Sequence, residues 1–282
     1  MVQEARQNAT TIRMLMNSPN VFCAVLLLAV FSIPHCAAGE EIPVHHIEGT
    51  SLGFLILRDE DGTPIAYGDL QQVVTKNYVM DDMKLKFNDG SFYQEITKFT
   101  QHRVLHVISN HLVQRGPSFK QQVDALIDTA SGNVTMSSID EKGKQKKVTK
   151  HLDLPPDLAN GLLMTIAKNL DPSAPSTTVS MVAGSSSLQI VKVKYSPQPE
   201  AIFHVGPVSY KAQHYRLKIE ITGVKGKVAP LIGKEPKDID MWLAKSESPS
   251  FLKFRGQMYE DGPIWEMELA APRDGTPQEK EK

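Results

Sequence analysis

Hydrophobic and polar residues alternate along most of the chain after residue 50. The clearest example is the stretch from Tyr215 to Ile221, where every second residue is apolar and the residues between are polar. Alternation of this kind predicts a β-strand with one buried face. Similar stretches lie at residues 79–87, 122–127 and 265–269. The pattern therefore favours a protein built mainly from strands.

Turn-forming triplets separate these stretches. Glu60-Asp61-Gly62, Asn88-Asp89-Gly90 and Ser131-Gly132-Asn133 are hairpin signals, and Lys142-Gly143-Lys144 is a weaker one. Strand and turn signals together predict about fifteen strands, eight between Ser51 and His151 and seven between Thr177 and Ala271. The short turns in the first group predict an antiparallel meander.

Between the two groups the period changes to that of a helix. Leucine or isoleucine recurs every fourth residue, at Leu158, Leu162, Ile166 and Leu170. Pro155 and Pro156 precede this stripe and Pro172 follows it, so the pattern predicts an amphipathic helix from Asp157 to Leu170. A helix this short is marginal alone in water. We therefore expect it to pack across the concave face of the sheet, with Ile166 in the core.

The predicted fold is mostly β. We expect an antiparallel, strongly curved sheet or barrel-like sandwich with one packed amphipathic helix. At 41% hydrophobic residues, the chain can bury a sizeable core. The expected organisation is a secretory signal peptide (1–38), a flexible N-terminal segment (39–47), a single β-rich domain (48–272) and a disordered charged tail (273–282).

The signal peptide is predicted from three features. Arg6 and Arg13 make a basic start, and residues 21–33 form an uncharged apolar run that is short for a membrane span of about 20 residues. Small residues in Cys36-Ala37-Ala38 predict cleavage before Gly39. The expected mature protein is exported to the periplasm of a Gram-negative-type bacterium, with no integral membrane span.

Other readings of the leader remain open. It could be an uncleaved anchor helix, the true start could be Met14 or Met16, and Cys36 could be a lipidation site. Both cysteines, Cys23 and Cys36, lie in this leader. A mature chain without them would have no disulfide and would depend on its core for stability.

Candidate chemistry is weak. The formal net charge of −1 indicates no general attraction for nucleic acid. His102 and His106 are four residues apart in a predicted strand, which separates them by about 13 Å, whereas ligands of one zinc each lie about 2 Å from the metal. Residues 250–253 fit the pattern S-x-x-K, but they lie in a predicted strand with Leu252 and Phe254 facing inwards. We predict no catalytic residues, no metal site and no cofactor.

Two further segments allow alternatives. Residues 226–233 form an apolar loop between glycines, and Pro230 keeps it from joining a sheet ladder. This loop could cap the core or act as a gate. Five lysines gather in residues 142–150; they could meet an anionic membrane surface or form a solvated turn.

Several motifs resemble those of a group of uncharacterised exported bacterial proteins with a β-rich fold. They are the runs at residues 154–161, 228–234 and 262–265, with Pro236, Asp238 and Trp242 between the last two. The likeness covers residues 47–272 and implies a Gram-negative-type envelope, but no activity. The element order also resembles periplasmic lipoprotein carriers, in which a curved sheet wraps a helix around an apolar cavity.

The expected function is a periplasmic binding or carrier protein for an apolar, lipid-like ligand, without catalysis. We expect ligand contacts from Leu162, Ile166, Leu231, Trp242 and Trp265. The alternative is a structural or partner-binding envelope protein with a filled core, and a hydrolytic enzyme comes third. Nucleic acid is not an expected partner.

Overall fold

The computed structural model describes residues 41–184, 188–205, 208–221 and 236–270. The chain divides into two units, residues 1–38 and residues 39–282. The first unit lies outside the described residues, so everything below concerns the second. The predictions for the leader, for the loop 226–233 with Leu231, and for the tail 273–282 also fall outside them. In the described part, no helix is long and apolar enough to cross a membrane.

The described residues form fourteen strands and one helix, α3. The first eight strands are β1 (Ser51–Arg58), β2 (Pro64–Val74), β3 (Val79–Phe87), β4 (Phe92–Gln101), β5 (Leu105–Arg115), β6 (Gln121–Asp128), β7 (Asn133–Asp140) and β8 (Gln145–His151). After α3 (Leu163–Asn169) come β9 (Thr177–Ala183), β10 (Gln189–Val205), β11 (Val208–Glu220), β12 (Ile239–Ala244), β13 (Phe251–Gln257) and β14 (Ile264–Leu269).

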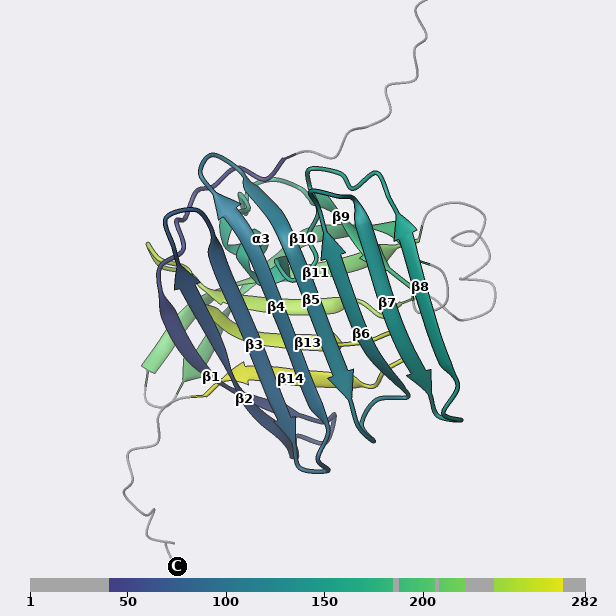
Figure 1. Ribbon diagram of the computed structural model, residues 1–282. Coiled ribbons are helices and arrows are strands. Elements are labelled where there is room, and N and C mark those ends of the chain that lie inside the picture. Colours follow the sequence, from purple (N-terminus) through teal and green to yellow (C-terminus); the bar gives the residue numbers. More distant parts are fainter. Residues whose placement is uncertain (1–40, 185–187, 206–207, 222–235, 271–282) are drawn as a thin grey trace, which may run out of the picture. The chain divides into compact units, whose positions relative to one another are not determined.

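All fourteen strands belong to one antiparallel sheet (Figure 1). Strands β1–β8 form a first meander and β9–β14 a second, in each of which every strand pairs with the next in sequence, and β1 pairs with β14 to join the two. The two ends of the sheet are β8 and β9, so the sheet is not closed. The predicted mostly β, antiparallel fold with one helix is confirmed, as are the eight strands between Ser51 and His151. The second group has six strands among the described residues, one fewer than predicted.

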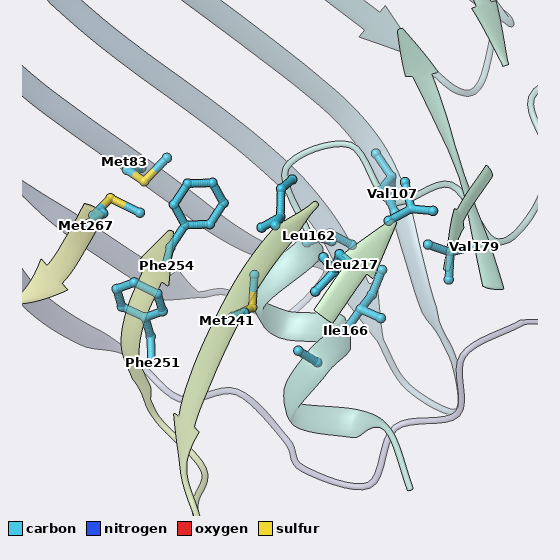
Figure 2. Close-up of a cluster of buried hydrophobic side chains, with 14 of the residues drawn as sticks. Met83, Val107, Leu162, Ile166, Val179, Leu217, Met241, Phe251, Phe254 and Met267 are labelled. Carbon is cyan, nitrogen blue, oxygen red and sulfur yellow. The ribbon is translucent and has the colours of Figure 1, made fainter. Parts of the chain in front are cut away.

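One hydrophobic core is shared by both meanders and by the helix. In β11, Tyr215 and Leu217 are buried as the alternation predicts. Figure 2 shows side chains from both halves of the sheet turned toward one another, for example Met83 of β3 and Met267 of β14, with α3 beside them. Burying these faces against each other supplies the main drive for folding.

The helix packs into this core as predicted, but it is shorter than predicted. Ile166 is 1% exposed, whereas α3 begins only at Leu163. The residues before it follow the edge of β9: the Ala159 N–H donates to the Ser180 carbonyl, and the Asn160 side chain exchanges hydrogen bonds with Val182. This pairing covers the backbone groups at that edge of β9, so these residues are not free to be helical.

A β-bulge corrects one further expectation. The pairing of β12 with β13 shifts between Trp242 and Leu243, which adds one residue to β13. Phe251 and Phe254 therefore both reach the main core, while Leu252 packs on the other side of the sheet in a small cluster with Ala212 and Ala244. The prediction that Leu252 faces inwards with Phe254 is wrong.

Candidate functional site

The inner face of the first meander carries three rows of side chains. The pairing of β2 to β8 places seven inward residues side by side in each row. The helix-side row consists of Gln72, Asp81, Thr97, Asn110, Ile127, Val134 and Lys150. The middle row consists of Leu70, Met83, Glu95, Leu112, Ala125, Met136 and Val148. The third row, called the aromatic-side row because a cluster of aromatic rings lies beyond it, consists of Gly68, Leu85, Tyr93, Gln114, Val123, Ser138 and Lys146.

The middle row is the most accessible of the three. Met83 and Met136 are buried, but the other five residues of this row keep part of their surface accessible. In the helix-side row, every residue from Gln72 to Val134 is buried. Six of the seven middle-row residues are apolar, so this row offers a largely apolar surface inside the fold, with the carboxyl of Glu95 as its one charged group.

Glu95 is held by two hydrogen bonds. The Asn110 amide donates to Glu95 Oε1 at 2.9 Å, and the Tyr93 hydroxyl donates to Oε2 at 3.0 Å. Asn110 also donates to Thr97 Oγ1 at 3.0 Å. Burial raises the pKa of the Glu95 carboxyl above its ordinary value, and the two hydrogen bonds partly oppose this rise. The network fixes the carboxyl in one orientation.

A second buried carboxyl lies in the helix-side row. Gln72 donates to Asp81 Oδ1 at 2.7 Å. Burial raises the pKa of Asp81 to about 6; the hydrogen bond from Gln72 and the charge of Lys168 oppose the rise, while Glu48 and Glu95 add to it. Lys168 of α3 is itself bound by both carboxylate oxygens of Glu48 at 2.9 Å.

Two buried polar atoms near the middle row have no hydrogen-bond partner. They are Gln114 Oε1 and Ser138 Oγ, in the aromatic-side row, and both residues are 3% exposed. The amide of Gln114 uses its Nε2 to donate to the Gln121 carbonyl at 3.1 Å. Buried polar atoms are almost always paired, so each such atom requires a physical explanation.

The start of the α3 segment lies directly on the helix-side row. Gly161 has φ of 71°, and a Cβ at this position would lie 1.8 Å from Thr97 Oγ1 and 2.5 Å from Asn110 Nδ2. Only glycine combines this backbone conformation with so close an approach. The helix is thereby placed against the polar residues that hold Glu95.

The end of α3 is tied to the N-terminal segment. The Asn169 side chain accepts hydrogen bonds from the His45 and His46 N–H groups at 2.7 and 2.8 Å. Ile42 is buried in the core, and Pro43 forms a bridge with Val104. Residues 39–47 were expected to be flexible; from residue 41 onwards they run between the helix end and the β4–β5 turn.

A cluster of aromatic rings packs against the aromatic-side row and includes Tyr93 of that row. The cluster consists of Phe87, Tyr93, Phe119, Tyr259 and Trp265, with the centroids of contacting rings 5.3–6.5 Å apart. Tyr259 also donates to the Ser118 carbonyl at 3.0 Å. The cluster joins the β5–β6 loop to β14 and to the β13–β14 loop, so the accessible middle row lies between these rings and α3.

Known proteins give no guide to this site. Comparison of the chain with protein-family models, curated proteins and solved structures finds no match. The resemblance to uncharacterised exported proteins thus stays a prediction. Among the residues that the structure describes, no group of three or more His, Cys, Asp or Glu side chains is placed to hold a metal ion.

The structure does not gather the five predicted ligand contacts into one site. Leu162 and Ile166 are core residues, each 1% exposed. Trp265 belongs to the aromatic cluster, on the other side of the middle row from α3. Trp242 lies in the small second cluster, where its ring stacks on His214 with centroids 4.5 Å apart. Leu231 lies outside the described residues.

The interior polar residues were missed, although a sequence signal for them exists. Asp81 has the same strand phase as Val79 and Met83, and Glu95 has the same phase as Tyr93 and Phe99. A polar residue in the apolar phase of a strand is predicted to face the core. What the sequence could not indicate is which of these groups find partners, because those partners come from other strands.

Proposed function

We propose that this protein binds an apolar, lipid-like molecule along the middle row, without catalysis, and that it acts as an exported carrier or binding protein in the periplasm. The observation that carries the proposal is the partial accessibility of Leu112, Ala125 and Val148 on the inner face. Apolar side chains that line the inside of a fold and stay accessible are typical of small-molecule sites.

The buried surroundings support the same reading. The α3 segment lies on one side of the middle row at β4 and β5 and the aromatic cluster on the other side at β3 and β4, so the part of a bound chain beside these strands would be shielded from water. Removing apolar surface from water contributes about 25 cal/mol per Å². An apolar molecule would gain this free energy on entering, and a polar one would not.

The test is a pair of phenylalanine substitutions on β6. Ala125→Phe adds a ring to the middle row, whereas Leu126→Phe puts the same ring on the outer face, where Leu126 is 47% exposed. The probe is the neutral fluorophore N-phenyl-1-naphthylamine. We expect Ala125→Phe to weaken binding by about tenfold or more, equal to about 1.4 kcal/mol, and Leu126→Phe to leave it unchanged. Equal binding by both variants would contradict the proposal.

A second candidate is a partner-binding envelope protein with a filled core. The exposure of Leu52, Phe54 and Tyr67 favours it, at 59%, 57% and 52% on the outer face of β1 and β2. Native mass spectrometry followed by organic extraction separates the two candidates. A carrier retains an extractable apolar molecule that Ala125→Phe displaces. A protein with a filled core retains none, and the added ring lowers its Tm by overpacking.

A further inference from the structure

We propose that the molecule bound along the middle row is a long-chain amine whose ammonium group binds the Glu95 carboxylate. This inference rests on the proposed function and adds the chemical class of the ligand. It starts from the composition of the row, in which Glu95 is the one charged residue and its neighbours toward β8 are Leu112, Ala125, Met136 and Val148.

Glu95 has unused capacity to accept hydrogen bonds. A carboxylate offers about four lone-pair positions, and Asn110 and Tyr93 occupy one on each oxygen. Both protein partners are neutral donors, so neither neutralises the carboxylate charge. A cationic ligand would supply the missing charge, and a charge-assisted hydrogen bond is roughly twice as strong as a neutral one.

The unpartnered acceptor of Gln114 gives a second, independent indication. Gln114 is opposite Tyr93 and two residues along β5 from Leu112, the residue opposite Glu95. Diagonal neighbours of this kind lie about 7–8 Å apart, so one group between the two side chains can reach both. An ammonium group has three N–H donors. It can bind Glu95 and also pair with Gln114 Oε1, which is buried and has no partner.

The charge balance at this part of the interior favours a cation. Three acidic groups, Glu48, Asp81 and Glu95, interact here, and Lys168, the cation that interacts with Asp81 among the described residues, is bound by Glu48. A carboxylate ligand would be repelled by the acids and would offer no donor. An alcohol would offer one donor and no charge.

The geometry also sets the length of the ligand. Glu95 lies on β4 and Val148 on β8, four strand spacings apart, which is roughly 19 Å. The side chains between them in the middle row are apolar. A linear alkyl chain of similar length, with its ammonium group at Glu95, would follow these side chains to the edge of the sheet.

The test compares three probes of equal chain length: dodecylamine, dodecanol and dodecanoate. Binding to the full-length protein freed of bound lipid is measured at pH 7.5 by displacement of N-phenyl-1-naphthylamine. We expect dodecylamine to bind about tenfold or more tightly than dodecanol, since one extra charged hydrogen bond contributes on the order of 1.4 kcal/mol. Dodecanoate should bind most weakly.

Two variants locate the effect. Glu95→Gln keeps the size of the side chain and removes its charge, so it should abolish the preference for dodecylamine over dodecanol. Asp82→Asn removes one acidic charge on the outer face of the adjacent strand and should leave the preference intact. If Glu95→Gln does not fold, Gln114→Leu removes the second acceptor and should reduce the preference severalfold.

The outcomes separate the two proposals. Equal affinity of the wild-type protein for amine and alcohol, or an amine preference that survives Glu95→Gln, overturns the assignment of Glu95 while the carrier function stands. Absence of binding by all three probes and by the fluorophore overturns the carrier function itself.

Discussion

Asp81 shows what burial does to a single residue on the inner face of the sheet. Its side chain is 8% exposed and has one neutral hydrogen-bond donor, Gln72. Loss of hydration disfavours the charged carboxylate more than this one hydrogen bond and the charge of Lys168 favour it, so the pKa rises to about 6. An ionised Asp81 therefore lowers the stability of the folded state at neutral pH.

This effect predicts a pH-dependent gain in stability for Asp81→Asn. The folded protein keeps the Asp81 proton up to about pH 6, while the unfolded chain releases it near 3.8. Stability of the wild-type protein therefore falls between these pH values and stays lower above them. Asparagine can still accept from Gln72, so above pH 6 the variant should be more stable by about 2–3 kcal/mol.

Urea unfolding of the two proteins at pH 4, 5, 6 and 7.5 measures this difference. The gain should be near zero at pH 4 and should grow to its full size by about pH 7. Asp82→Asn, which removes a carboxyl bound by Lys84 and Gln94 on the outer face of the same strand, is the control and should lower the stability instead of raising it. A difference between wild type and Asp81→Asn that does not change with pH would contradict the prediction.

At the scale of the elements, α3 depends on its contacts more than on its own sequence. It has seven residues and no side-chain cap at its start, and a helix of this length has little stability by itself. Its position comes from Gly161 against Thr97, from Asn169 binding the His45 and His46 backbone, and from Ile166 in the core.

Replacing Ile166 tests whether the helix is part of the core or a movable cover. If it is core, Ile166→Ala should lower the free energy of unfolding by about 2–5 kcal/mol. Met164→Ala, at a partly exposed position of the same helix, is the control and should cost less. Thermal melts with and without dodecylamine measure both variants. A smaller loss for Ile166→Ala, combined with weaker ligand retention, would indicate a gate, and a change within about 0.5 kcal/mol would exclude both roles.

At the scale of the whole unit, the pairing of β1 with β14 joins the two meanders into one sheet. Leu55 and Leu57 of β1 are 1% and 0% exposed, and both belong to the core that also holds Met267 of β14. Neither meander can bury its inner face without the other. We therefore expect the unit to unfold in a single cooperative transition.

Two spectroscopic signals test this expectation. Both tryptophans, Trp242 and Trp265, lie in the second meander, whereas far-ultraviolet circular dichroism reports all strands. The two denaturant midpoints should coincide. Leu57→Ala, a cavity-forming change in the first meander, should shift both midpoints together. A shift of the dichroism alone, or a two-step curve, would show that the meanders unfold separately.

The sequence by itself determined the local structure. Side-chain alternation and glycine turns predicted the strands from Ser51 to His151, and the stripe through Leu162 and Ile166 predicted a buried helix. These features were predictable because the period of a strand or helix and the φ values of a turn depend on residues close together in the chain.

The tertiary structure decided what depends on distant partners. Asp157 and Asn160 form hydrogen bonds with the edge strand β9, so the helix begins only at Leu163. A bulge in β13 turns Leu252 to the other face of the sheet. Likewise, strand pairing places Glu95 beside Asn110 and leaves Gln114 Oε1 unpaired. The physical reason is common to all three: a residue's phase along a strand sets the face on which its side chain lies, but only the packing of other segments sets its hydrogen bonds, its burial and its charge.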